Sequence, residues 1–147
     1  MILPILRHPD PVLRVVCTPV AGDATALARD MLDTMYAAPG RGLAAPQVGV
    51  TERLFVMDAT WKEGLPDPRV FLNPAIVARE GRQVNEEGCL SIPDTPRRVA
   101  RPARVTLEWD GAAGRRREAF EGFAAACICH EMDHLDGVLI LDHPAAP

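Results

Sequence analysis

The sequence predicts an α+β fold in which antiparallel strands pack around a C-terminal helix. Apolar residues recur at helical spacing near both ends of the chain, and strand-like runs fill the middle. Helices and strands do not alternate as they would in a series of βαβ units, so the pattern favours α+β over a parallel α/β sheet. No internal repeat or linker divides the chain, and residues 1–147 are expected to form a single domain.

The first predicted helix covers residues 24–38. Leu27, Met31 and Met35 lie on one stripe, which is the apolar spacing of an amphipathic helix. Asp23 is the expected N-cap, because its side chain can accept a hydrogen bond from a free N–H of the first turn. The Pro-Gly pair that follows is expected to end the helix.

The middle of the chain predicts strands. Residues 53–59 and 69–80 read as two strands separated by a loop that contains proline and glycine. Residues 103–120 alternate, turn at the sequence DGAAG and alternate again, which predicts a hairpin. From about Glu121 the pattern becomes helical and continues to Gly137, a residue suited to the left-handed conformation that follows a helix.

Composition and charge favour an ordinary globular protein. Hydrophobic residues make up 48% of the chain, and no apolar run approaches the ~20 residues that a membrane span needs. The N-terminus has no signal-peptide pattern, so a cytoplasmic location is expected. A net charge of −4 argues against a bulk nucleic-acid binder.

Positive charge is nevertheless concentrated in residues 97–117, which contain seven of the fifteen arginines. The simpler interpretation is that these arginines cover the solvated faces of two strands. The alternative is a local contact with an anion, such as a peptide carboxylate or an RNA-rich partner.

The segment CHEMDHLDG, residues 129–137, contains the pattern His-Glu-x-x-His. His130 and His134 are four residues apart, so both rings leave the same face of a helix and can bind one ion. Glu131 lies about 100° round the helix from His130, so its carboxylate can reach a water at the ion without being a ligand. The competing interpretation is structural, with two helix histidines, a surface glutamate and no metal.

A third ligand is expected upstream of this helix. The position where a metzincin carries its third histidine is Ile140, and no glutamate follows Glu131. Disulfides are not expected in a cytoplasmic chain, so each cysteine is a thiol or a candidate ligand.

Three cysteines are candidates for the third ligand. Cys127 precedes His134 by seven residues, or ~10 Å of helical rise, which is too far to share the ion comfortably. Cys129 points away from the histidine stripe and is expected to pack as a small buried hydrophobe. Cys89 stands in EEGCLSIP, near the end of a strand, and completes a Cys-His-His set with an open fourth position, as catalytic sites have.

Three motifs together resemble the peptide deformylase family. They are GRGLAAPQ (residues 40–47), EGCLS (87–91) and HEMDH (130–134), and the opening ILRHPDPVLR is also similar to the N-terminus of that family. The first motif matches a dinucleotide fingerprint, but that fingerprint needs a strand before it and a helix after it, so nucleotide binding is not expected. The resemblance implies removal of the formyl group from N-formylmethionyl peptides.

The resemblance also implies the site residues and partners. Cys89, His130 and His134 would hold a divalent metal, typically Fe²⁺, with Zn²⁺ or Ni²⁺ also able to occupy the site. The expected partners are the N-formylmethionyl peptide and the ribosome, with no membrane and no specific nucleic acid. The implied catalytic residues are Glu131, Gln47 and the backbone N–H of Leu90, and the implied substrate-binding residues are Gly42, Leu43, Gly88 and Arg97.

The chain departs from the family pattern at several positions. Cys129 replaces a usual glutamine and Arg41 a usual apolar residue. Pro96 stands where many relatives carry a peptide-binding arginine, for which Arg97 or Arg98 could substitute, and only ten residues follow Gly137. These departures indicate a short or divergent member, such as a deformylase-like paralogue. The alternatives are a related amidase for another small N-acyl group and a metal-binding protein without turnover.

Overall fold

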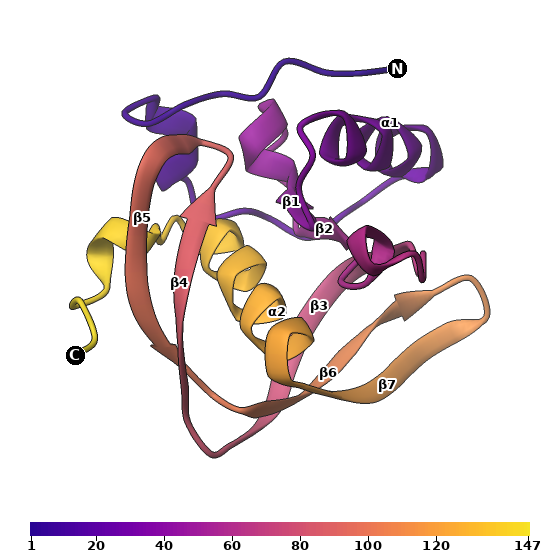
Figure 1. Ribbon diagram of the computed structural model, residues 1–147. Helices are drawn as coiled ribbons and strands as arrows, with labels where there is room; N and C mark the ends of the chain where they lie inside the picture. Colours follow the sequence, from indigo (N-terminus) through magenta and orange to yellow (C-terminus); the bar gives the residue numbers. More distant parts are fainter.

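Two antiparallel sheets and two helices make up the chain in the computed structural model, which describes residues 1–147 (Figure 1). The larger sheet has the strand order β1-β2-β3-β6-β7, and β4 pairs with β5 in the smaller one. The strands are β1 (Gly42–Ala44), β2 (Leu54–Met57), β3 (Arg69–Glu80), β4 (Gln83–Cys89), β5 (Ile92–Arg101), β6 (Arg104–Gly111) and β7 (Gly114–Glu121). The helices are α1 (Thr25–Ala37) and α2 (Gly122–Leu135), with short 3-10 turns η1 (Pro11–Arg14), η2 (Ala45–Val48), η3 (Trp61–Glu63) and η4 (Ile140–Asp142). The predicted α+β class is confirmed.

Strand β2 is buried on both faces because the two helices cover opposite sides of it. Successive side chains of a strand point to opposite faces. Leu54 and Val56 therefore pack with Met31 of α1, whereas Phe55 packs in the cluster that contains Ile128 of α2. This alternation explains why β2 reads as a continuous apolar run.

Helix α2 runs through the middle of the molecule and lies against both sheets (Figure 1). The β4–β5 hairpin is fixed beside it by a separate apolar cluster, in which Ile92 and Val99 pack with Leu139 and Ile140 from the segment after α2. Because the hairpin and the helix are both anchored, the end of β4 is held over the C-terminal half of α2.

The predicted helices and the 103–120 hairpin agree with the structure to within one or two residues. The N-cap of α1 is a small correction, because Ala24 occupies that position. The Oδ1 of Asp23 still accepts the N–H of Thr25 at 2.9 Å. Gly137 adopts φ of +72°, as predicted for the residue after α2.

The sequence did not predict β1 or the β4–β5 hairpin. Pro93 and Pro96 obscure the strand pattern of β5, since proline cannot donate to a sheet ladder and is found on edge strands. Strand β5 is such an edge, because it pairs only with β4.

Most of the clustered arginines pair with carboxylates of their own chain. Arg115 lies 3.0 Å from Asp110, and Arg117 lies 3.0 Å from Glu108. The interpretation of solvated strand faces agrees with these contacts, although Arg101 is buried. No helix in the chain combines the length and apolar character needed to cross a bilayer.

Candidate metal centre

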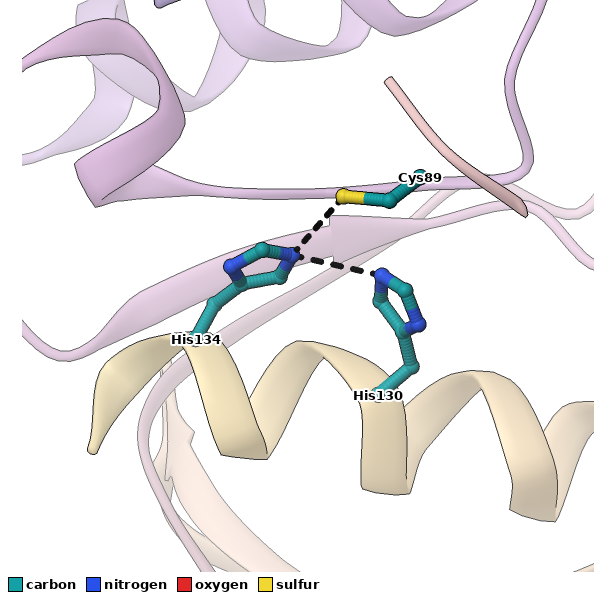
Figure 2. Close-up of side chains that lie close together, drawn as sticks. All are labelled: Cys89, His130 and His134. Atoms are coloured by element: carbon teal, nitrogen blue, oxygen red, sulfur yellow. Dashed lines mark hydrogen bonds between the residues drawn. The ribbon is translucent and has the colours of Figure 1, made fainter. Parts of the chain in front are cut away.

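Three side chains from two elements converge beside α2. His130 and His134 leave one face of the helix a turn apart, and Cys89 reaches them from the end of β4 (Figure 2). The Sγ of Cys89 lies 3.4 Å from Nε2 of His134, which lies 3.2 Å from Nε2 of His130. All three ligand atoms fall within 4.8 Å of one another.

These separations fit a divalent ion. Donor atoms around a tetrahedral ion with bonds of 2.0–2.3 Å stand about 3.3–3.7 Å apart. One thiolate and two imidazoles form a donor set that suits iron, nickel and zinc. Burial lowers the pKa of His134 well below its usual value, which favours the neutral imidazole that a metal requires.

A chain of charged groups extends behind His130. Its Nδ1 lies 3.0 Å from Oε1 of Glu87, and Arg101 donates to both oxygens of Glu87 at 2.8 Å. Arg101 also donates to Asp133 at 2.6 Å, and Asp133 lies 2.7 Å from Nε2 of His143. Burial alone would raise the pKa of Glu87, but the hydrogen bonds from Arg101 and His130 outweigh it and lower that pKa to about 2. The carboxylate therefore stays charged and can orient His130 as a ligand.

Glu131 lies beside the ligands with one oxygen unpaired. Its side chain is buried, and Oε1 has no hydrogen-bond partner in the chain. Burial raises its pKa to about 7. A buried, unpartnered carboxylate is costly unless it serves a molecule that binds there.

Two hydrogen bonds fix the side-chain amide of Gln47. Its Oε1 accepts the N–H of Ala44 at 2.9 Å, and its Nε2 donates to Oγ of Ser91 at 3.0 Å. The same Nε2 lies 3.8 Å from Sγ of Cys89. The amide nitrogen of Gln47 is therefore held next to Cys89, His130 and His134.

Residues 2–146 match the sequence profile of a family described as polypeptide deformylase. The chain belongs to this family. It is 50% identical over 147 residues to a peptide deformylase of Rhizobium meliloti, an alignment that covers 97% of this chain and 84% of the relative. The crystal structure of the Thermotoga maritima peptide deformylase has a TM-score of 0.92 and 38% identity, covering 100% of this chain and 99% of that one. A Met-Ala-Ser-bound peptide deformylase of Acinetobacter baumannii has a TM-score of 0.89 and 29% identity, covering 98% and 99%. The predicted family, fold and enzyme class are confirmed.

The candidate metal centre opens into a cavity of about 690 Å³ between the β4–β5 hairpin and the larger sheet. Of the residues expected to bind substrate, Gly42 and Gly88 line it, as do Gln47 and Leu90. Leu43 is fully buried in the core below, so only its backbone could serve a ligand.

Arg97, the remaining residue expected to bind substrate, has its hydrogen-bond partner outside the cavity. It does not line the cavity, because its Nε donates instead to the carbonyl of His143 at 2.8 Å. The hydrogen bond directs the side chain toward the C-terminal segment and away from the site.

The other cysteines take the places that the sequence indicated. Cys127 and Cys129 are both buried in the core cluster of α2 and lie outside the ligand group. Burial raises the pKa of Cys129 to about 11 and that of Cys127 well above its usual value, so both remain thiols.

Sequence reasoning missed the charged groups behind His130. Glu87 lies in the motif EGCLS and Asp133 in HEMDH, but Arg101 lies twelve residues beyond Cys89 and outside every motif. The only available signal was an arginine at an inward-facing position of β5, which alternation could have exposed had the strand been recognised.

Proposed function

We propose that the protein removes the formyl group from N-formylmethionyl peptides, with a divalent ion held by Cys89, His130 and His134. The observation that carries this proposal is the ligand cluster beside the buried, unpartnered carboxylate of Glu131, at the inner end of a cavity. Family membership supports the same reaction.

The reaction divides between the ion and the side chains around it. Cys89, His130 and His134 would hold the divalent ion, which would supply a Lewis acid for the formyl carbonyl and would lower the pKa of a water to near neutrality. Glu131 accepts the proton of the attacking water and returns it to the departing amine. Its unpaired Oε1 and its raised pKa, about 7, suit both transfers.

Negative charge develops on the formyl oxygen during the attack. The Nε2 of Gln47 and the backbone N–H of Leu90 are the proposed donors to that oxygen, since both residues line the cavity next to Cys89. Gln47 needs no reorganisation for this role, because Ala44 and Ser91 already hold its amide group.

The peptide backbone has two strand edges available to it. Strand β1 is the first strand of the larger sheet and β4 pairs only with β5, so each has one free edge. Both strands contribute residues to the cavity, including Gly42 and Gly88. We propose that the peptide adds as a strand between them and bonds to the backbone of Gly42, Leu43 and Gly88. The Met-Ala-Ser ligand of the Acinetobacter relative supports a peptide of this kind.

The finer assignments belong to the same proposal. The donor set admits Fe²⁺, Zn²⁺ or Ni²⁺, and we propose Fe²⁺ because the family resemblance implies it. We also propose a cytoplasmic location, with nascent peptides at the ribosome as the source of substrate. One domain spanning residues 1–147 accounts for the fold.

Formate release from formyl-Met-Ala-Ser tests this function, with the acetylated peptide as the competing substrate. Glu131→Gln keeps the size and one hydrogen bond of the side chain but cannot accept a proton. Turnover of the formyl peptide should fall by about 10²- to 10⁴-fold while metal content stays unchanged. Glu80→Gln, at an exposed position on β3, is the matched control and should retain full turnover.

Three outcomes would contradict the proposal in different ways. Hydrolysis of the acetylated peptide alone would indicate an amidase for another acyl group. Bound metal without formate release by the unmutated protein would indicate a binding role. Unchanged turnover in Glu131→Gln would remove Glu131 from the reaction.

A further inference from the structure

The cavity continues from the metal centre along α2 toward its first turn. Residues 130, 127 and 123 lie near one face of the helix, and seven residues span about 10 Å. Ala126 and Cys127 line the cavity one turn from His130, and Phe123 lines it two turns away with 48% of its surface exposed. A long side chain on the first residue of a formylated peptide would extend over Ala126 and Cys127 toward Phe123.

Arg41 stands at that far end of the cavity. Its Cζ lies 4.9 Å from the ring centroid of Phe123, so the guanidinium covers the aromatic face. Nη2 pairs with Oε1 of Glu63 at 2.9 Å, but the Glu63 side chain is 53% exposed. An ion pair this exposed is weak and leaves the guanidinium open to a competing anion. Nε and Nη1 of Arg41 form no hydrogen bond within the chain.

The other charged groups of the cavity are arranged asymmetrically. Lys62 of η3 lines the cavity on the same side as Arg41. Of the acidic residues that line the cavity, Glu86, Glu87 and Asp94 belong to the opposite wall, which the β4–β5 hairpin forms. Glu131 lies on α2 next to His130, at the other end of the cavity from Phe123. The wall that holds Phe123 and Arg41 therefore presents both an apolar surface and unsatisfied cationic donors.

We infer that Arg41 determines specificity at this end of the cavity, and that it extends the accepted first residue from methionine to glutamate. This inference rests on the proposed deformylase function. A methionine side chain packs on Phe123 and on the aliphatic stem of Arg41. A glutamate of similar length places its carboxylate where the guanidinium can donate charge-assisted hydrogen bonds.

The test compares kcat/KM for formyl-Glu-Ala-Ser-amide and formyl-Met-Ala-Ser-amide. The C-terminal amide removes the second carboxylate, so Arg41 has only the side chain to bind. Arg41→Met should lower the ratio of kcat/KM for the glutamate peptide to that for the methionine peptide by about 10-fold. This factor corresponds to the free energy of one charge-assisted hydrogen bond in a partly exposed site. Glu63→Gln should raise the ratio, because it removes the anion that competes for Arg41. Arg41→Lys should keep part of the preference, since it retains the charge but loses the fork.

Two controls separate this inference from general electrostatics and from other subsites. Arg116→Met removes the same charge from an exposed position on β7 and should leave the ratio unchanged. Formyl-Met-Glu-Ser-amide carries its acid on the second residue. The ratio of its kcat/KM to that of formyl-Met-Ala-Ser-amide should not change in Arg41→Met. A response there, or an unchanged Glu-to-Met ratio in Arg41→Met, overturns the inference. Failure of the unmutated protein to deformylate the methionine peptide would instead reject the proposed function.

Discussion

Replacing Gly42 by alanine is expected to damage both the fold and the activity, because the backbone of β1 lies directly against α2. A Cβ at this position would stand 2.5 Å from Oε2 of Glu131 and 2.8 Å from Sγ of Cys127. Both atoms are the ends of buried side chains, and both side chains line the cavity. The Glu131 carboxylate and the Cys127 thiol, or the backbone of β1, must therefore shift.

The expected magnitude follows from overpacking a buried contact. An added methyl group in a filled core costs about 1–3 kcal/mol in the free energy of unfolding. For a chain of this length that loss corresponds to a fall in Tm of roughly 3–10 °C. Displacement of the Glu131 carboxylate by even ~1 Å should also lower turnover by about 10²-fold. Thermal unfolding and formate release measure the two effects separately.

Gly88→Ala is the matched control for stability. Gly88 also lines the cavity, but a Cβ there would meet nothing within 4 Å, and its φ does not lie in the left-handed region. Its Tm should stay close to that of the unmutated protein. If Gly42→Ala unfolds at the same temperature as Gly88→Ala and keeps full turnover, then Glu131 does not pack against β1 and the geometry argued for it is wrong.

Two further predictions concern the metal ligands and Glu87, the carboxylate that contacts His130. Replacing Cys89 or His134 by alanine should abolish binding of the divalent ion, whereas Cys127→Ala should retain it; full occupancy by elemental analysis in Cys89→Ala would reject the ligand set. Glu87→Gln should lower the stability by about 3 kcal/mol, because it leaves a buried arginine with less compensation, and should weaken metal affinity by about 10- to 100-fold. Denaturant unfolding measures the loss of stability, and metal competition measures the affinity. Glu118→Gln is the control, because its partly exposed ion pair should contribute less than about 1 kcal/mol to the free energy of unfolding.

The sequence by itself determined the elements whose pattern is local. The spacing of apolar residues located α1, β2, β3, the β6–β7 hairpin and α2. The pair His130 and His134 was also a local inference, because four residues along a helix bring two rings to one face. Cys89 could be selected by excluding the alternatives, since the helical rise left Cys127 too far away.

The tertiary structure decided what depends on contacts between distant segments. The β4–β5 hairpin draws its stability from packing against the C-terminal segment, so its proline-containing strand had no clear local signal. That packing brings Cys89 to the histidines, buries Arg101 against Glu87 and turns Arg97 away from the cavity. A side chain's partner depends on which segments the core brings together, and no local pattern contains that information. For this reason the candidate ligands were readable from the sequence, whereas the charged groups behind His130 and the walls of the cavity were not.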